Sequence, residues 1–230
     1  MTHPSAPDTE TPRDTIDVIS DVVCPWCYIG KRHLEEALDS LPADVRPIVR
    51  WHPFQLNPDL PGAGVDRRSY LEQKFGGADR ATQIYERVKA AGRQAGLALD
   101  FDAILRQPNT LDAHRLVAWA QGSGADTEPL VEALFKAYFV EGRFIGDRAV
   151  LAAIAGECGL DAAAARALLD SELGAADITE MDRRTRQMGI TGVPFFVFNQ
   201  RVGVSGAQGS AALLDALAQS REAPEAARGH

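Results

Sequence analysis

The chain has 230 residues, a hydrophobic fraction of 45% and a formal net charge of -8. That length suits one large domain or a small domain that carries a second one, and the hydrophobic fraction is ordinary for a globular protein. Nucleic-acid-binding proteins generally carry a basic patch or stripe, so the acidic balance argues against nucleic acid as a partner. No run approaches the roughly 18 consecutive apolar residues of a membrane span, so a membrane partner is not expected either.

The two ends of the chain have compositions typical of flexible tails. Residues 1–13 contain three prolines, several acidic and hydroxyl residues, and no apolar run of the kind found in a secretory signal. Residues 221–230 are rich in Ala, Glu, Arg and Pro. We therefore expect flexible tails at 1–13 and 221–230. With no signal and only three cysteines in the chain, we expect a cytoplasmic location.

A pair of cysteines follows the first apolar run. The β-branched residues of 16–23 lead into Cys-Pro-Trp-Cys at 24–27, and apolar residues at helical spacing follow. The pattern predicts a strand, a turn and a helix with Cys24 at its N-terminus, where backbone N–H groups stabilise a thiolate, the nucleophilic form of cysteine. Cys27, one turn further along, can attack a mixed disulfide on Cys24 and release the partner. We therefore predict that Cys24 is the nucleophile and Cys27 the resolving thiol.

The same pair could instead be half of a zinc site. Zinc sites normally need four ligands, and the only other cysteine is the isolated Cys158. Redox chemistry is therefore favoured, and no metal is expected.

Cys158 is predicted to be a buried free cysteine. His33 lies more than two helical turns beyond Cys24, which favours a surface residue over an activating base.

The remaining pattern changes twice along the chain. A strand is predicted at 48–51 and a loop at 55–64. From 65 to 188 apolar residues recur three or four apart, which predicts an all-helical insertion of roughly 120 residues. Asp147 and Asp161 are predicted helix N-caps.

After residue 188 the pattern reverts to strand, turn, strand and helix. These segments are 192–198, 199–201, 202–204 and 207–219. The simplest assembly is one α/β domain made from 14–64 and 189–220, interrupted by a helical domain at 65–188.

The motifs resemble the thioredoxin-fold superfamily, and more narrowly its DsbA-like group. The match lies in Cys-Pro-Trp-Cys at 24–27 and in Gly192-Val193-Pro194. A wider set, at 20–31, 53–58, 109–110, 114–116, 134–139, 192–199 and 205–208, is similar to the FrnE-like cytoplasmic branch. The resemblance covers about residues 15–220. It implies an α/β, thioredoxin-like fold with a large all-helical insertion and the activity of a protein disulfide oxidoreductase.

The resemblance also implies roles for individual residues. The Val193–Pro194 bond should be cis and face the cysteines, and the Val193 backbone should pair with a bound peptide by strand addition. Trp26, between the cysteines, is expected to contact substrate. Asn109 and His114 lie in a segment that resembles one facing the cleft, so each is predicted either to bind substrate or to serve only in helix capping and packing.

The aromatic residues at 135, 138 and 139 are predicted to belong to the core rather than to a binding surface, because they lie at helical spacing.

Three functions remain after these observations. The leading one is a cytosolic thiol-disulfide oxidoreductase with no bound cofactor, a redox-active Cys24–Cys27 disulfide and glutathione as an optional co-substrate. Its partners would be thiol or disulfide proteins and a thioredoxin- or glutathione-type recycling system; a homodimer is compatible with the sequence. The second is a glutathione-dependent isomerase, of the 2-hydroxychromene-2-carboxylate type, or a kappa-class glutathione transferase. Those relatives typically place serine where Cys24 stands. The third is a non-enzymatic binding or metal-binding module.

Overall fold

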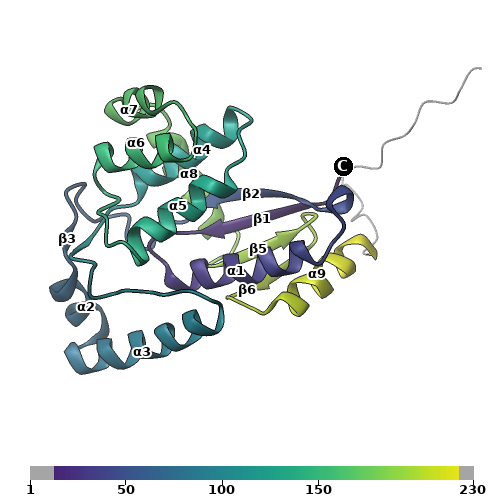
Figure 1. The fold of residues 1–230 in the computed structure, drawn as a ribbon, viewed down its shortest axis with the longest axis horizontal. Coiled ribbons are helices and arrows are strands. Elements are labelled where there is room, and N and C mark those ends of the chain that lie inside the picture. The colour runs from purple at the N-terminus through teal and green to yellow at the C-terminus, as the bar shows by residue number, and fades with distance from the viewer. Residues whose placement is uncertain (1–12, 223–230) are drawn as a thin grey trace, which may run out of the picture.

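The computed structural model describes residues 13–222, and both ends of the chain build one sheet (Figure 1). The strand order is β2-β1-β5-β6, with β1 at Thr15–Ser20, β2 at Ile48–Pro53, β5 at Phe195–Phe198 and β6 at Val202–Ser205. β1 pairs in parallel with β2 and antiparallel with β5, and β5 pairs antiparallel with β6. The C-terminal part of the chain thus completes a sheet that the N-terminal part begins.

Two helices from opposite ends of the chain accompany this sheet. Helix α1 (Pro25–Asp39) follows β1, begins directly after Cys24 and contains Cys27, and α9 (Ser210–Glu222) follows β6. They pack side by side (Figure 1). A 3-10 turn at Ala43–Val45 connects α1 to β2.

The helices of the middle segment gather over one end of the sheet and beside it (Figure 1). They are α2 (Arg67–Phe75), α3 (Ala78–Gln94), α4 (Leu111–Gly122), α5 (Glu128–Phe139), α6 (Arg148–Glu157), α7 (Ala162–Asp170) and α8 (Ala175–Gln187). Helices α4 and α8 contact β2. The N-cap predictions are confirmed, because Asp147 accepts the Ala149 N–H at 2.7 Å and Asp161 accepts the Ala163 N–H at 2.9 Å.

Two predictions about this architecture were wrong in detail. The middle segment is not all-helical, because β3 (Val65–Asp66) pairs antiparallel with β4 (Arg106–Gln107). Strands of two residues are too short to show an alternating pattern. The predicted C-terminal tail begins inside α9, where the Arg221 guanidinium lies 2.7 Å from the Asp14 carboxylate.

The other residues of the predicted tails, 1–12 and 223–230, lie outside the described part of the chain. The division into a sheet domain and a helical domain stays a prediction.

A continuous apolar core joins the sheet to the middle helices. The side chains of Phe135, Tyr138 and Phe139 are fully buried, which confirms their predicted place in the core. Tyr28 of α1 stacks on Phe135 of α5 with ring centroids 5.0 Å apart. Among the described helices, none is both long and apolar enough to cross a bilayer.

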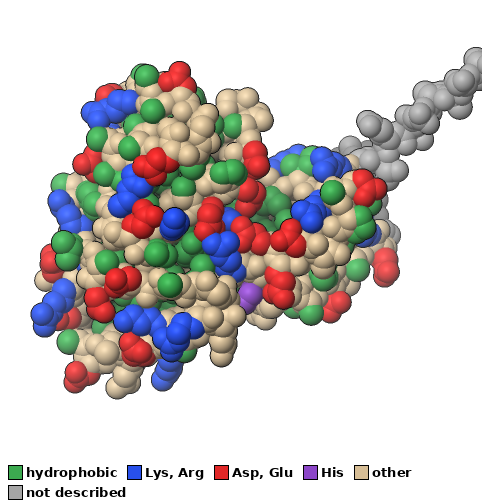
Figure 2. All heavy atoms as spheres, viewed as in Figure 1, with side chains coloured by type: hydrophobic (Ala, Val, Ile, Leu, Met, Phe, Trp, Pro, Cys, Tyr) green, Lys and Arg blue, Asp and Glu red, His purple; other side chains and the backbone are tan. Residues whose placement is uncertain are grey.

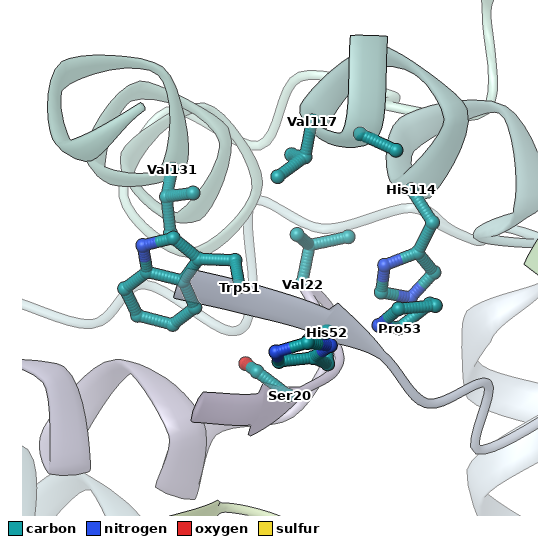
Figure 3. A pocket seen from close by; sticks show the side chains of 9 residues that line it. Ser20, Val22, Trp51, His52, Pro53, His114, Val117 and Val131 are labelled. Atoms are coloured by element: carbon teal, nitrogen blue, oxygen red, sulfur yellow. The ribbon is translucent and has the colours of Figure 1, made fainter. Parts of the chain in front are cut away.

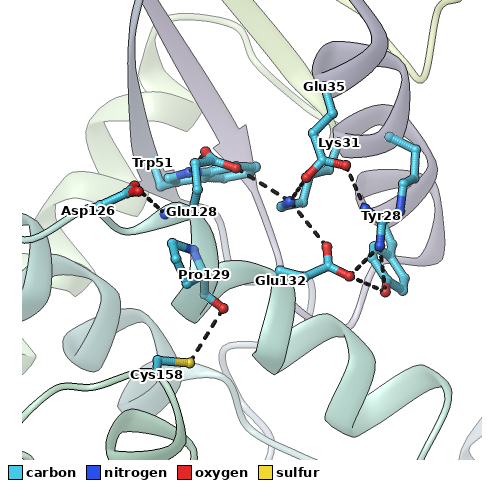
Figure 4. A network of polar contacts seen from close by, with 10 residues as sticks. Tyr28, Lys31, Glu35, Trp51, Asp126, Glu128, Pro129, Glu132 and Cys158 are labelled. Atoms are coloured by element: carbon cyan, nitrogen blue, oxygen red, sulfur yellow. Dashed lines mark hydrogen bonds and ion pairs between the residues drawn. The ribbon is translucent and has the colours of Figure 1, made fainter. Parts of the chain in front are cut away.

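A charged network also ties α1 to α5 (Figure 4). Lys31 is 1% exposed, and its ammonium lies 3.4 Å from a carboxylate oxygen of Glu128 and 3.1 Å from one of Glu132. Glu35, on α1 itself, is a third anionic partner of Lys31. The Tyr28 hydroxyl donates to Glu132 at 2.7 Å. The helix with the cysteines is therefore held to α5 by apolar and ionic contacts together.

The visible outer surface mixes both signs of charge (Figure 2). Acidic and basic side chains alternate over it, so no large field of one sign covers that face.

Candidate active site

The two cysteines lie where β1 gives way to α1. Cys24 is the N-cap residue of α1, and its backbone N–H donates to the Asp21 carbonyl at 2.9 Å. Pro25 occupies the first helical turn, where its missing N–H costs no hydrogen bond. Both thiols are free, and Cys24 is 5% exposed and Cys27 2% exposed. Cys24 therefore stands directly before the first N–H groups of α1, but its side chain accepts no capping hydrogen bond from them.

Cys27 has a different environment although it is one turn away. Burial raises the pKa of the Cys27 thiol well above its usual value, and the neighbouring Cys24 raises it further. The Ser20 hydroxyl and a backbone hydrogen bond from Asp21 lower the pKa without cancelling the rise. Cys27 is therefore a protonated thiol at neutral pH.

A distant loop is brought against Cys24. The Val193–Pro194 peptide bond is cis, and the Cys24 thiol lies 3.6 Å from the Val193 carbonyl oxygen in hydrogen-bonding geometry. Gly30 of α1 packs against the same loop, since a Cβ at that position would lie 3.0 Å from Pro194 Cγ and 3.2 Å from Phe196 Cζ. Sequence reasoning missed Gly30. The sequence did offer a signal for it. A glycine inside a predicted helix weakens that helix, so its presence there suggests that close packing requires it.

The residues predicted to bind substrate lie in different settings. Trp26 is 41% exposed at the start of α1, next to both cysteines. Asn109 instead holds a loop: its side-chain amide donates to the carbonyls of Pro58 at 3.0 Å and Leu60 at 2.8 Å, and its oxygen accepts the Leu111 N–H at 2.9 Å. These contacts use the whole side chain of Asn109. Substrate contact by Trp26 and Asn109 stays a prediction.

His114 lies in α4 and contacts the loop that precedes Cys24. Its side chain is 7% exposed, and its Nε2 is 3.4 Å from Oδ1 of Asp21. Asp21 is completely buried, and its Oδ2 accepts the Leu56 N–H at 2.7 Å. Figure 3 shows the His114 ring pointing from α4 toward Pro53 at the end of β2. The structure thus joins His114 to the loop that precedes Cys24, while its predicted contact with substrate remains untested.

Asp21 was not singled out by sequence reasoning. The available signal was a charged residue between the apolar run of β1 and the cysteines, three positions before Cys24. Charged residues are rarely buried unless they are paired.

The other candidate residues lie apart from this centre. His33 contacts the Gln208 carbonyl through Nδ1 at 2.9 Å. Cys158 is half-buried rather than buried, because it ends α6 with its Sγ 3.5 Å from the Pro129 carbonyl. Within residues 13–222, no group of three or more His, Cys, Asp or Glu side chains is placed to hold a metal ion.

The chain is similar in sequence and in structure to known proteins. The model of the DSBA-like thioredoxin domain family matches residues 15–218. The crystal structure of a probable DsbA oxidoreductase, SCO1869 from Streptomyces coelicolor, is 30% identical with a TM-score of 0.82, over 95% of this chain and 94% of that one. The curated protein YwbO of Bacillus subtilis (strain 168) is 27% identical over 217 residues, which are 90% of this chain and 97% of YwbO.

A third similarity shows the fold alone. The cytosolic disulfide reductase DsbM from Pseudomonas aeruginosa, solved with GSH, is 20% identical with a TM-score of 0.59, over 90% of this chain and 96% of that one. The family model, by contrast, spans nearly the whole described chain, from β1 through both cysteines to α9. The chain therefore belongs to the DSBA-like thioredoxin domain family, with an α/β thioredoxin-like fold that a helical insertion interrupts.

Proposed function

We propose that the protein is a cytosolic thiol-disulfide oxidoreductase of the FrnE-like branch, with Cys24 as the nucleophile and Cys27 as the resolving thiol. The observation that carries the proposal is the asymmetry of the two thiols. Cys24 is the N-cap residue of α1 beside the Val193 carbonyl, whereas Cys27 lies one turn inside the helix, where burial raises the pKa of its thiol. A thiol at a helix N-terminus is suited to attack, and a protected thiol one turn away is suited to the second step.

The reaction consists of two exchanges of sulfur bonds. In the reducing direction, the Cys24 thiolate attacks a substrate disulfide, one substrate sulfur leaves as a thiolate, and the other stays bonded to Cys24. Cys27 then loses its proton and attacks the Cys24 sulfur. The Cys24–substrate bond breaks, the second substrate sulfur leaves as a thiolate, and the Cys24–Cys27 disulfide forms. Two electrons pass to the substrate, and the oxidising direction reverses both steps.

The substrate would be a protein or peptide that lies across the start of α1. Its backbone would pair with Val193 by strand addition, and the exposed indole of Trp26 would pack on it. Glutathione or a thioredoxin-type protein would return the cysteine pair to its starting state. Glutathione as a co-substrate is in keeping with the similarity to DsbM, whose structure was solved with GSH.

The direction of electron flow depends on how well the reduced pair is stabilised. Trp26 supplies no cation beside Cys24, and cationic neighbours are one of the features that stabilise a thiolate. Equilibration in glutathione redox buffers measures the reduction potential of the Cys24–Cys27 pair. A potential of about -270 mV indicates a reductant, and one of about -120 mV an oxidant.

Trapping of mixed disulfides tests the proposed mechanism. In a Cys158→Ser background, Cys27→Ser treated with oxidised glutathione should accumulate a mixed disulfide between Cys24 and one glutathione, with the second glutathione released as a thiolate. The adduct is visible by intact-protein mass spectrometry. Cys24→Ser in the same background is the matched control and should show no stable adduct. If Cys27→Ser forms no adduct with glutathione or with a disulfide-bonded peptide, the proposal fails.

The second candidate is a glutathione-dependent isomerase or transferase. The GSH-bound DsbM structure makes it worth testing, although Cys24 stands where such relatives typically have serine. Calorimetric titration of the reduced protein with reduced glutathione separates the two functions. Saturable binding by Cys24→Ser, without any exchange by the unchanged protein, would favour the isomerase or transferase. Metal analysis of protein purified under reducing conditions tests the metal-binding module.

A further inference from the structure

The Arg67 guanidinium is buried without a carboxylate partner. Arg67 begins α2 and is 4% exposed. It donates to three neutral oxygens: Gln107 Oε1 at 2.8 Å, the Tyr138 hydroxyl at 2.8 Å and the Tyr85 hydroxyl at 3.0 Å. Its Nε–H has no partner, and within residues 13–222 no carboxylate forms an ion pair with it. Charged side chains are rarely buried unless they are paired, so this cation lacks an anion.

Aromatic rings stabilise the guanidinium only in part. Its central carbon lies 5.2 Å from the ring centre of Tyr85, 5.6 Å from that of Tyr138 and 5.9 Å from that of Phe101. Such rings attract a cation through the negative charge on their faces, but they carry no net charge. The described residues around Arg67 therefore do not neutralise it.

Arg67 lines an open cavity between α2, α3 and residues 101–105. Its volume of about 720 Å³ lies in the range of small-molecule sites. The buried residues of its wall are Arg67 and the apolar Ala81, Phe101 and Ile104. Leu105 also lines the cavity and is 74% exposed. The cavity thus offers apolar surface beside one buried cation.

The Tyr85 hydroxyl supplies a hydrogen-bond donor at this cavity. Its oxygen accepts an Arg67 N–H at 3.0 Å, and in the described part of the chain its own O–H donates to no acceptor. A phenol is both donor and acceptor, so this proton is free for a ligand. Burial raises the pKa of Tyr85, and the Arg67 charge lowers it without cancelling the rise. The hydroxyl is therefore protonated at neutral pH.

The other charged side chains around the cavity restrict the charge of a ligand. They are exposed or partly exposed and have partners of their own: Asp66 with the Ser69 N–H, Arg68 with Glu72, and Lys89 with Glu86 and Asp102. Carboxylates outnumber cations in this set, so they would repel a multiply charged anion. The cavity therefore suits a ligand with a single negative charge.

We propose that this cavity binds a small organic molecule that has an apolar body and one carboxylate. The carboxylate accepts the Tyr85 O–H, and the Arg67 guanidinium behind that hydroxyl balances its charge. A hydrogen bond to an ionised acceptor is stronger than one between neutral groups. The apolar body packs on Phe101, Ile104 and Leu105. Neither cysteine of the proposed active site lines this cavity, so the inference does not depend on the proposed function.

Calorimetric titration of the full-length, reduced protein at pH 7 tests the proposal. The probes are 3-phenylpropionate and octanoate, which each carry one carboxylate. Their counterparts are 3-phenylpropionamide, which is neutral, and inorganic phosphate, which is multiply charged. A carboxylate probe should bind saturably, one molecule per chain. The amide and phosphate should bind at least about tenfold more weakly, because neither can pair a single charge with Arg67.

Variants locate the carboxylate within the cavity. Tyr85→Phe removes only the hydroxyl and should weaken carboxylate binding about tenfold. Arg67→Met should weaken it at least as much, and Tyr85→Phe serves if Arg67→Met does not fold. Arg68→Met is the matched control, because Arg68 lines the same cavity but is 85% exposed and pairs with Glu72. That control should stay within about twofold of the unchanged protein.

Several results would overturn the inference. It is wrong if neither carboxylate binds with a dissociation constant below about 1 mM, or if the amide binds as tightly as the carboxylate. It is also wrong if Tyr85→Phe and Arg67→Met both keep the original affinity. Cys24→Ser should bind the probe like the unchanged protein; loss of binding in that variant would place the probe at the cysteines and not in this cavity.

Discussion

Replacing Lys31 with methionine should destabilise the protein severely, because it leaves three carboxylates around an uncharged side chain. At an effective dielectric constant of about 20, an ion pair at 3.1 or 3.4 Å has a Coulomb energy of roughly 5 kcal/mol. Desolvation of the buried ammonium offsets much of this. Removal of one partner from a buried ion pair costs about 3–5 kcal/mol, and Glu128 and Glu132 are partly exposed, so we expect a loss of about 3 kcal/mol.

Urea denaturation followed by far-UV circular dichroism measures this loss. Lys136→Met is the matched control, because Lys136 lies on α5, the helix that Lys31 contacts, but its side chain is 58% exposed and its ion pair with Glu141 spans 3.4 Å. That control should leave the midpoint nearly unchanged. The double variant Lys31→Met/Glu132→Gln should lose less than the sum of the two single losses, since each single change already breaks the Lys31–Glu132 ion pair. A loss below about 1 kcal/mol for Lys31→Met would refute the reasoning.

Two further predictions concern α1 and its contact with α5. Gly30→Ala should lower stability by about 1 kcal/mol and change the rate of disulfide exchange. The added methyl group would lie 3.0 Å from Pro194 and 3.2 Å from Phe196, and this crowding outweighs the helix propensity that alanine gains. Gly122→Ala is the control, because residue 122 faces open space at the end of α4, and it should be neutral or stabilising in the same urea titration. Burial acts to raise the pKa of Glu132, but its hydrogen bond with Tyr28 and the charges of Lys31 and Arg32 lower it overall. Ionised Glu132 therefore stabilises the fold above the usual glutamate pKa of about 4.3, and this contribution is lost as the pH falls through the lowered folded value. Glu132→Gln should cost about 2 kcal/mol at pH 7 and progressively less below pH ~4 in unfolding curves measured across that range; a constant difference would contradict the assignment.

The parts of the fold that could be predicted from the sequence are those that depend on residues close together in the chain. Cys24, Pro25 and Cys27 follow a strand and open a helix within one contiguous stretch, so strand, turn and helix could be predicted from periodicity alone. The capping roles of Asp147 and Asp161 depend on the next few residues only. The place of the Val193–Pro194 loop beside Cys24 required the resemblance to a family, because no local pattern connects two segments so far apart in the chain.

The parts that sequence missed depend on contacts between distant segments. Lys31 looks like a surface residue of an amphipathic helix, yet α5 brings two glutamates over it and makes it buried. His114 was expected either to face a substrate or to serve in packing, and α4 buries it against Asp21, a partner that the sequence did not indicate. Arg221 was assigned to a tail because of its composition, but its ion pair with Asp14 lies at the end of α9. In each case the partner, rather than the residue itself, decides the environment.

The middle helices therefore do more than cover a complete thioredoxin-like sheet. Residues 14–64 and 189–220 would supply Cys24, Cys27 and Pro194 on their own, but the partners of Asp21 and Lys31 come from α4 and α5. The burial of Cys27, which raises the pKa of its thiol, depends on the core that α5 shares with α1. His114 of α4 faces the Asp21 carboxylate in the loop before Cys24, and Glu128 and Glu132 of α5 face Lys31 of α1. The insertion therefore fixes the surroundings of both the loop and the helix that hold the cysteines.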